Sequence, residues 1–394
     1  MEPWSHRAAD RSGQRALATY DFQGRKLMKS RITPLALAIA TTTAFAATGA
    51  SAIELTYGSY TSPTHTTYVN GVVPTMKRIT EQTKGELTFE TFTGGAMGGP
   101  KELLGNVKSG ILDAASVVDI YVKSSLPVSS LLSSMIAIGD DPKVMAAAMN
   151  EMQLLHCPDC IAERERNNVI GLSWSATGAY HVICKEPIKG LADLQGRKIR
   201  ATSGVGRSML AIGASPVSIT TAEMYEAMQR GQIDCVVGAT AWLNTYNLKD
   251  FAKGVWSNAV GSYFGTMNFA VNLDVWNDLT DEERAAFRDN MAHNVAEIMW
   301  AYVSDNETAM EWLAANGGTV EESDQAFKDA WKEQQSLTVQ ETIEAGKADG
   351  IDDAEEVVTT FMGLVDKWTG IVAKVGNDKA AYEKALNDEI FSKI

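Results

Sequence analysis

The four cysteines carry the most reactive side chains of this chain, and two of them are close together. Cys157 and Cys160 stand in the segment HCPDC, residues 156–160, whose CxxC spacing suits a thioredoxin-like redox pair or half of a zinc site. A second CxxC is absent, and Cys184 and Cys235 are isolated. In an exported chain, four cysteines indicate two structural disulfides, with three pairings open. We expect disulfides; a periplasmic thiol–disulfide or zinc protein using Cys157 and Cys160 is the alternative function.

A glycine-rich run, GGAMGGP, occupies residues 94–100. Glycines before the start of a helix can present backbone amides to an anion. The run lacks the Gly-Lys-Ser/Thr ending of a phosphate loop, so we do not expect nucleotide binding.

The N-terminal residues have the order of an export signal. Residues 28–31 (MKSR) give a positive start, residues 34–48 are apolar and Ala-rich, and residues 50–52 (ASA) supply the small side chains that a signal peptidase reads. The apolar run is too short and too rich in Thr to span a bilayer, which needs about 20 apolar residues. We interpret 1–27 as a mis-assigned start and 28–52 as a signal peptide, and expect a periplasmic protein. A lipid anchor is the alternative, but no Cys follows the small residues.

The mature chain is strongly acidic. Residues 1–52 contain seven Lys/Arg and three Asp/Glu, a net +4, so removing them from the formal −14 leaves about −18. Such a charge repels nucleic-acid backbones and anionic lipid, so neither is an expected partner. No later stretch is apolar enough to span a membrane, and we expect a soluble chain. An anionic ligand would therefore need a local Arg or Lys in an otherwise apolar pocket.

Roughly 340 mature residues suggest two domains. The first part alternates strands (53–57, 86–93, 111–118) with helices that begin near His65 and at Pro100, an order typical of a mostly parallel sheet. On the helix from His65, the pattern places Val69, Val72, Val73, Met76 and Ile79 on one face. A second alternating series begins near residue 168, and the strand 263–273 could return to the first domain.

A long helix is predicted after Thr280, which forms a capping box with Glu283. Nothing breaks the pattern before Asn316-Gly317, so the helix would be about 50 Å long, enough to lie across two domains. The alternative is two helices with a kink near residues 304–306. The tail from Asp324 is helical, and its candidates for burial are Trp331, Phe361, Leu364, Val365 and Trp368.

Several segments, in the same order along the chain, resemble motifs of the DctP family, the solute-binding proteins of TRAP transporters. Residues 191–200 (LADLQGRKIR) are similar to its DLKGxKIR segment, and 213–217 with 223–234 are similar to its GAxPxxxxxxExYxALQxGxvDG pattern. Residues 103–113 resemble its xxxVxxGxxD segment, and the helix after Thr280 resembles its domain-spanning helix. The resemblance covers essentially the whole mature chain.

This resemblance implies a two-domain α/β periplasmic binding protein fold, with a cleft between the domains and the long helix spanning both. We expect 53–175 plus 262–300 as domain I, 176–261 plus 301–350 as domain II, and 351–394 as a C-terminal helical segment. The implied function is capture of a small organic carboxylate by cleft closure and its delivery to the integral membrane subunits of the transporter. The chain would act as a monomer, without catalysis and without a cofactor.

Arg200 stands where the family's carboxylate-binding arginine stands, at the end of a predicted strand. A guanidinium group suits a carboxylate through two parallel hydrogen bonds; the alternative is a surface Arg in a basic run. Tyr180 occupies a position where some members place a second arginine, which favours a monocarboxylate over a diacid. Trp174 is a candidate apolar wall or a core residue.

Other site candidates follow predicted strands. Where members often carry an Asn or a metal-binding acid, this chain offers Gly238, Thr240 and Trp242, so we expect no bound metal. Tyr60 and His65 follow the first strand, and Asp119 and Tyr121 follow the third; each is a cleft residue or an ordinary loop residue. An acid beside an anion is costly unless it meets a cation, so a cleft position for Asp119 would imply a ligand with an amine or several hydroxyls.

Overall fold

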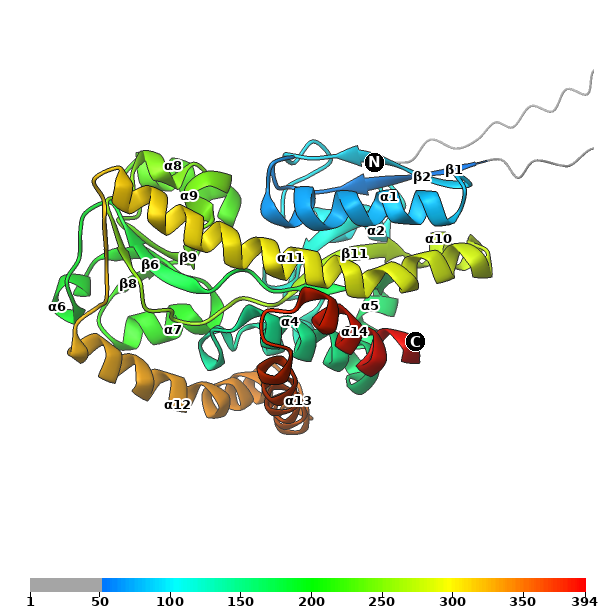
Figure 1. Ribbon diagram of the computed structural model, residues 1–394. Helices are drawn as coiled ribbons and strands as arrows, with labels where there is room; N and C mark the ends of the chain where they lie inside the picture. Colours follow the sequence, from blue (N-terminus) through cyan, green and yellow to red (C-terminus); the bar gives the residue numbers. More distant parts are fainter. Residues whose placement is uncertain (1–51) are drawn as a thin grey trace, which may run out of the picture. The chain divides into compact units, whose positions relative to one another are not determined.

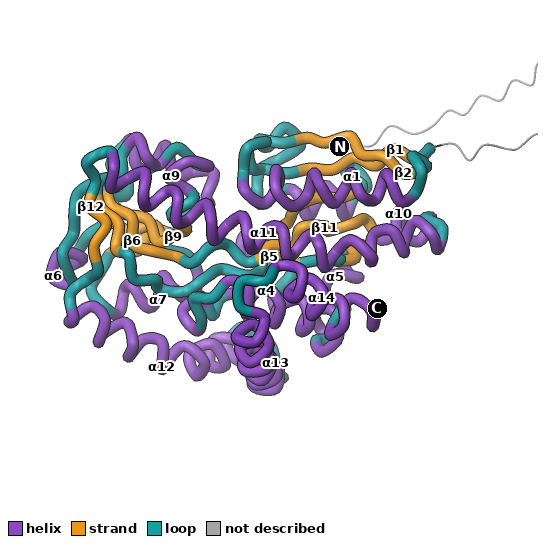
Figure 2. Tube along the Cα trace, viewed as in Figure 1, coloured by secondary structure: helices purple, strands orange, loops and turns teal. Residues whose placement is uncertain are grey.

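The computed structural model of the protein describes residues 52–394, which form one compact unit. Except for Ala52, the predicted leader lies outside the described residues. Two sheets of six strands each occupy separate parts of this unit, as the two groups of orange strands in Figure 2 show. The predicted α/β class is therefore confirmed, whereas the predicted domain boundaries stay a prediction.

The first sheet has the strand order β2-β1-β3-β11-β4, and β5 also pairs with β11. Its strands are β1 (Ile53–Gly58), β2 (Leu87–Phe92), β3 (Ala114–Val118), β4 (Val169–Gly171), β5 (Trp174–Ser175) and β11 (Thr266–Asn272). β1 is parallel to β2 and β3, whereas β11 is antiparallel to β3, β4 and β5. Among the described strands of this sheet, β11 is therefore the only one that is antiparallel to the others.

The second sheet has the order β12-β10-β6-β9-β7-β8. Its strands are β6 (Tyr180–Cys184), β7 (Lys198–Arg200), β8 (Ser215–Val217), β9 (Cys235–Ala239), β10 (Gly254–Trp256) and β12 (Thr319–Glu321). β6 is antiparallel to both of its neighbours, β9 and β10, and the remaining pairs are parallel. The antiparallel strands, β11 in the first sheet and β6 in the second, thus begin at the edge where the other strands of their sheet end. Open α/β sheets generally bind ligands at this edge.

The long helix α11 (Asp281–Ala315) is continuous over 35 residues, so the predicted strut is confirmed and the kink near 304–306 is absent. Thr280 and Glu283 form the predicted capping box, and Asn316 is the C-cap. Figure 1 shows α11 running past both sheets.

Two asparagines fasten α11 to the two sheets. Asn294 Oδ1 accepts hydrogen bonds from Ser173 Oγ and from Asn268 Nδ2 on β11, both at 3.0 Å. Asn306 lies twelve residues later, or about 18 Å along the axis. Its Oδ1 accepts from Ala241 N and its Nδ2 donates to Ala179 O, each at 2.9 Å. The helix is therefore held to the first sheet at Asn294 and to the segments that flank β6 and β9 at Asn306.

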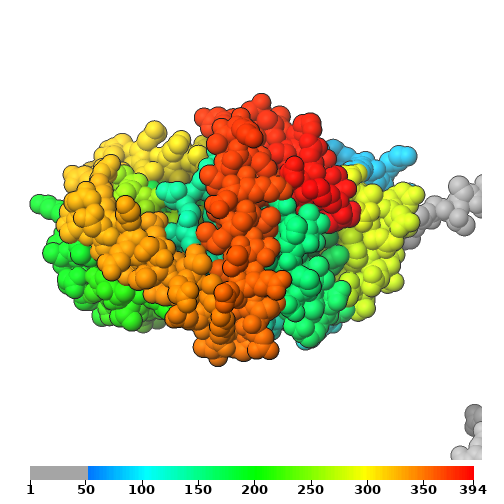
Figure 3. Space-filling model, turned by 90° about the horizontal axis from the view of Figure 1, so that it is seen from below, coloured from blue at the N-terminus to red at the C-terminus, as the bar shows by residue number. Residues whose placement is uncertain are grey.

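The remaining α-helices cover the sheets. They are α1 (Val73–Gln82), α2 (Leu103–Lys108), α3 (Pro127–Ser133), α4 (Pro142–Glu151), α5 (Pro158–Arg166), α6 (Leu191–Leu194), α7 (Ser203–Ala211), α8 (Met224–Gln229), α9 (Trp242–Thr245), α10 (Leu273–Asp278), α12 (Gln325–Ala348), α13 (Ala354–Val375) and α14 (Lys379–Glu389). Figure 3 shows the segment from α12 to α14, orange to red, across one face of the molecule. All five predicted core residues of this tail are buried. Within residues 52–394, no helix is long and apolar enough to cross a membrane.

Two helix predictions are wrong in detail. The helix from His65 starts as a π-helical turn, Tyr68–Val72, before α1. A π turn holds more residues than an α turn and shifts the buried face, so Val69 and Val73 are exposed while Met76 remains buried. The helix expected to open at Pro100 begins instead at Leu103, after a turn.

Both expected disulfides are present. Cys184 and Cys235 are directly opposite each other on β6 and β9 and are joined, and Cys157 is joined to Cys160 at the start of α5. No described cysteine is free. Of the three pairings left open by the sequence, the structure therefore selects this one.

Candidate functional site

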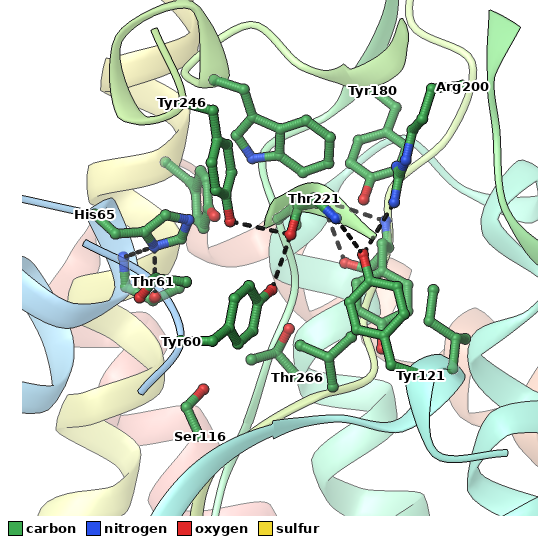
Figure 4. A pocket seen from close by; sticks show the side chains of 17 residues that line it. Tyr60, Thr61, His65, Ser116, Tyr121, Tyr180, Arg200, Thr221, Tyr246 and Thr266 are labelled. Atoms are coloured by element: carbon green, nitrogen blue, oxygen red, sulfur yellow. Dashed lines mark hydrogen bonds between the residues drawn. The ribbon is translucent and has the colours of Figure 1, made fainter. Parts of the chain in front are cut away.

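A cavity lies between the two sheets, at the edges where their parallel strands end (Figure 4). Its empty volume is about 460 Å³, including the part that is open to solvent. The walls come from β3, from the last residue of β7, from segments that follow β1, β3, β8 and β9, from residues at or before the starts of β6 and β11, and from α11. The lining residues are Tyr60, Thr61, His65, Thr67, Ser116, Val118, Ile120, Tyr121, Thr177, Tyr180, Arg200, Thr221, Trp242, Tyr246, Tyr263, Thr266 and Tyr302.

Arg200 is the only lining residue with a permanent charge. It ends β7, and only 2% of its surface is exposed. Its Nε donates to Ile219 O at 3.1 Å and its Nη2 donates to Tyr121 Oη at 3.0 Å, while its guanidinium carbon lies 5.7 Å from the ring centre of Trp242. No described Asp or Glu forms an ion pair with it. A buried charge without a counter-ion is costly, and no described acidic side chain offsets this cost for Arg200.

Tyr121 accepts a hydrogen bond from Arg200, and its own O–H group remains free to donate another. Its Oη accepts hydrogen bonds from Arg200 Nη2 and from Thr221 N, both at 3.0 Å. A phenol oxygen offers two acceptor positions, so its own O–H is directed to a third group. Among the described residues none accepts it, and an anion bound at Arg200 would lie within its reach.

Six of the eleven tyrosines of the chain line this cavity. Burial raises the pKa of Tyr60, Tyr180, Tyr246 and Tyr302, so these phenols stay neutral and keep their protons at neutral pH. Tyr180 and Tyr246 each contact the indole of Trp242 edge to face, with ring centres 5.2 and 5.7 Å apart. The walls are thus aromatic rings whose polar atoms are neutral donors and acceptors.

Thr221 joins the two sides of the cavity. Its Oγ1 forms hydrogen bonds with Tyr246 Oη at 3.3 Å and with Tyr60 Oη at 3.1 Å. Tyr60 and Tyr121 follow strands of the first sheet, whereas Thr221 follows β8 of the second. Tyr60 and Tyr121 therefore link the first sheet to the second through Thr221. In this structure, the two sides of the cavity are held together by these hydrogen bonds.

The structure brings together six of the ten predicted ligand-binding residues. Arg200, Tyr180, Trp242, Tyr121, Tyr60 and His65 all line the cavity. The other four, Trp174, Gly238, Thr240 and Asp119, do not.

Three of these four have structural roles nearby. Trp174 is a core residue on β5 whose ring is covered by the guanidinium of Arg164, 5.0 Å from the ring centre. Thr240 Oγ1 donates to Asn306 O at 2.9 Å and so ties β9 to α11. A Cβ on Gly238 would lie 2.2 Å from the Trp242 ring, so glycine at this position gives the indole its place in the wall.

Asp119 does not line the cavity and is a buried acid. Its Oδ1 accepts hydrogen bonds from Ser133 Oγ at 2.5 Å and from Tyr263 Oη at 2.8 Å. Burial raises the pKa of Asp119 to about 8, with the nearby charge of Glu163 acting in the same direction. Its carboxyl group is therefore mostly neutral at pH 7, and the expected requirement for a ligand amine does not follow from its position.

Several lining residues were not predicted, among them Thr221, Tyr246, Tyr263 and Tyr302. Tyr302 has a signal in the sequence, because it is an aromatic residue in the middle of a helix expected to cross both domains. Tyr263 has one too, as the first residue of the strand expected to return to the first domain. Within residues 52–394, no group of three or more His, Cys, Asp or Glu is arranged to hold a metal ion.

The sequence of this chain matches a known family and several known proteins. The family model for bacterial extracellular solute-binding proteins, family 7 (DctP), matches residues 57–345. An uncharacterized Salmonella typhimurium protein, YiiZ, is 25% identical over 206 residues, 50% of this chain and 59% of its own length. A monocarboxylate 2-oxoacid-binding periplasmic protein of Nostoc is 25% identical over 255 residues, 63% of this chain and 68% of its own. The chain thus spans about three fifths to two thirds of these relatives.

Two solved structures share the fold. A TRAP solute-binding protein of Rhodoferax ferrireducens with copurified benzoate superposes with a TM-score of 0.72 at 17% identity, covering 81% of this chain and 99% of the other. A marine metagenome TRAP solute-binding protein specific for aromatic acids, bound to 3-hydroxybenzoate, has a TM-score of 0.72 at 20% identity, covering 80% and 99%. These matches confirm the expected two-domain fold with its long helix. The chain therefore belongs to the DctP family, the solute-binding proteins of TRAP transporters.

Proposed function

We propose that this protein binds a small aromatic monocarboxylate in the cavity between its two sheets. One observation carries the proposal: Arg200 is buried in a wall of tyrosines and has no acidic partner among residues 52–394. The ligand carboxylate would supply the missing negative charge and accept from the guanidinium and from the Tyr121 O–H. A single cation in the cavity suits one carboxylate and leaves a second one unpaired.

The aromatic character of the ligand is supported by the walls. Aromatic pairs gain energy from edge-to-face and offset contacts in addition to buried area. The cavity offers six phenol rings, one indole and one imidazole to a flat ligand. The benzoate and 3-hydroxybenzoate complexes of proteins with the same fold agree with this assignment.

Binding and release, without chemical change of the ligand, is the proposed activity. We propose that the loaded protein delivers its ligand to TRAP membrane subunits in the periplasm. The alternative function at Cys157 and Cys160 receives less support, because both residues are at most 1% exposed and are joined to each other. The export proposal is tested by N-terminal sequencing of protein from the periplasmic fraction of cells that express the full chain; the expected first residue is Ile53.

Calorimetric titration of the purified protein tests the ligand class. Benzoate and 3-hydroxybenzoate should bind with a stoichiometry of one, and succinate should bind at least tenfold more weakly than the better of these two acids. Tight binding of succinate together with weak binding of both aromatic acids would contradict the proposal.

A further inference from the structure

His65 lies on the far side of the cavity from Arg200. Figure 4 shows His65 and Thr61 on one side, Arg200 and Tyr180 on the other, and Thr221 between them. The imidazole is 5% exposed and lines the cavity together with the ring of Tyr302. A ligand whose carboxylate is bound at Arg200 would therefore direct its opposite end toward His65.

The hydrogen bonds of His65 determine which ring nitrogen carries the proton. Nδ1 accepts from the backbone N–H of Thr67 at 3.3 Å, and it lies 2.8 Å from Thr67 Oγ1. A backbone N–H can only donate, so Nδ1 must be unprotonated, and the proton of the neutral ring is on Nε2. Burial lowers the pKa of His65 to about 4, which agrees with a neutral ring.

The Nε2–H group of His65 has no hydrogen-bond partner among the described residues. The ring itself is held between Tyr246 and Tyr302, which it meets edge to face at centre distances of 5.4 and 6.2 Å. These contacts fix the imidazole plane and leave a rigid, neutral donor in the cavity wall. Because no described residue accepts from this N–H, a ligand that brings an acceptor would gain a hydrogen bond that the protein alone does not form.

We propose that His65 recognises an uncharged oxygen at the end of the ligand remote from its carboxylate. The preferred ligands are then aromatic monocarboxylates with a ring hydroxyl or carbonyl group, rather than unsubstituted aromatic acids or diacids. This inference rests on the proposed function and narrows its ligand class. A second carboxylate would meet a neutral imidazole and neutral phenols at this end, with no cation to balance it.

Titrations of three ligands into the wild type and into variants of His65 test the inference. Benzoate, 3-hydroxybenzoate and 4-hydroxybenzoate are titrated into the wild type and into His65→Phe, which keeps a ring but removes both nitrogens. In the wild type, the better hydroxylated acid should bind about tenfold more tightly than benzoate, and in His65→Phe this ratio should fall to about one. His65→Gln, whose amide can place a donor near the site of Nε2, should restore part of the ratio.

Tyr246→Phe is the matched control, because it removes a hydroxyl from the same wall while keeping the ring beside His65. It should change the affinities for benzoate and for the hydroxylated acids by similar factors. A wild type that binds all these acids without preferring the hydroxylated ones, or a preference that survives in His65→Phe, overturns the inference and leaves the proposed function standing. Failure of the wild type to bind any of these acids overturns both.

Discussion

The guanidinium of Arg200, at the end of a strand of the second sheet, donates to the phenol oxygen of Tyr121, which follows a strand of the first sheet, at 3.0 Å. This bond crosses the cavity wall between the two sheets and fixes the orientation of the only permanently charged lining group. The proposed carboxylate site is thus completed only when the sheets are close together. Affinity and closure are expected to depend on the same few contacts.

Replacing Tyr121 by Phe removes one acceptor from Arg200 and one donor from the ligand. A hydrogen bond to a charged group contributes about 1.5–3 kcal/mol, so the dissociation constant for the best aromatic acid should rise about ten- to hundredfold. Calorimetry measures this change. Tyr225→Phe, which removes a hydroxyl bound to Asp250 outside the cavity, is the control and should leave affinity unchanged. Equal affinities of both variants would show that Tyr121 does not support the carboxylate.

Arg200→Lys keeps the charge but loses the planar fork that can bind a carboxylate through two parallel bonds. The loss of one charge-assisted hydrogen bond should raise the dissociation constant about ten- to hundredfold, while the fold survives. Arg207→Lys is the matched control, because Arg207 lines a neighbouring groove and is exposed. Circular dichroism should be unchanged for both. An Arg200→Lys protein that binds as tightly as the wild type would exclude Arg200 from the site.

Asp119 should make stability fall as pH rises. The carboxyl group has an ordinary pKa of 3.8 and a folded-state pKa of about 8, so between these values the folded protein holds a proton that the unfolded chain has lost. The contribution of this group to the free energy of unfolding therefore decreases by about 1.4 kcal/mol per pH unit in that window. In Asp119→Asn the group cannot ionise, and the stability of the variant relative to the wild type should increase from about pH 4 to about pH 8 and then level off. Urea unfolding at several pH values measures both curves, and parallel curves would contradict the assignment.

The two disulfides should differ in their contribution to stability. Cys184–Cys235 closes a loop with a sequence separation of 51, whereas Cys157–Cys160 has a separation of only 3. In the chain-entropy model these loops correspond to about 4 and about 1.6 kcal/mol. We expect Cys184→Ala/Cys235→Ala to lower the free energy of unfolding by more than Cys157→Ala/Cys160→Ala. Denaturant titration of both double variants measures this difference, and the opposite order would contradict the model.

The parts of the fold and the site that could be predicted are those with local signals. Thr280 and Glu283 mark the start of the long helix because a capping box involves residues only three positions apart. Arg200 could be placed because a short run of residues resembles a family segment and ends a strand.

The position of Asp119 depends on contacts between residues far apart in sequence. Asp119 follows a strand of the first sheet, as expected, but its side chain bonds to Ser133 and to Tyr263, the latter 144 residues away. No local pattern reveals these partners, so the sequence could not show that the acid does not line the cavity. The exposure of Val69 has a different cause, because a π-helical turn shifts the periodicity on which the prediction relied.

Thr221 is expected to control closure of the cavity. Its Oγ1 bonds to Tyr60 of the first-sheet side and its backbone N donates to Tyr121, so two contacts across the cavity meet at one residue. Thr221→Val keeps the shape and the backbone donor but removes the hydroxyl, and one neutral hydrogen bond contributes about 0.5–1.5 kcal/mol. We expect the ligand-free variant to populate more open states and to bind the best aromatic acid about three- to tenfold more weakly.

Small-angle scattering measures this opening directly. Hinge closure around a ligand predicts a smaller radius of gyration at saturation than in the ligand-free protein. In Thr221→Val the ligand-free radius should be larger than in the wild type, and saturating ligand should bring both proteins to the same value, because the bound carboxylate then holds Arg200 and Tyr121 together. The Thr245→Val variant is the control, since that hydroxyl donates to the O atom of Ala241, the N-cap of its own helix, at 3.3 Å. Identical scattering of Thr221→Val and wild type without ligand, or no change on ligand addition to either, would contradict a closure held by Thr221.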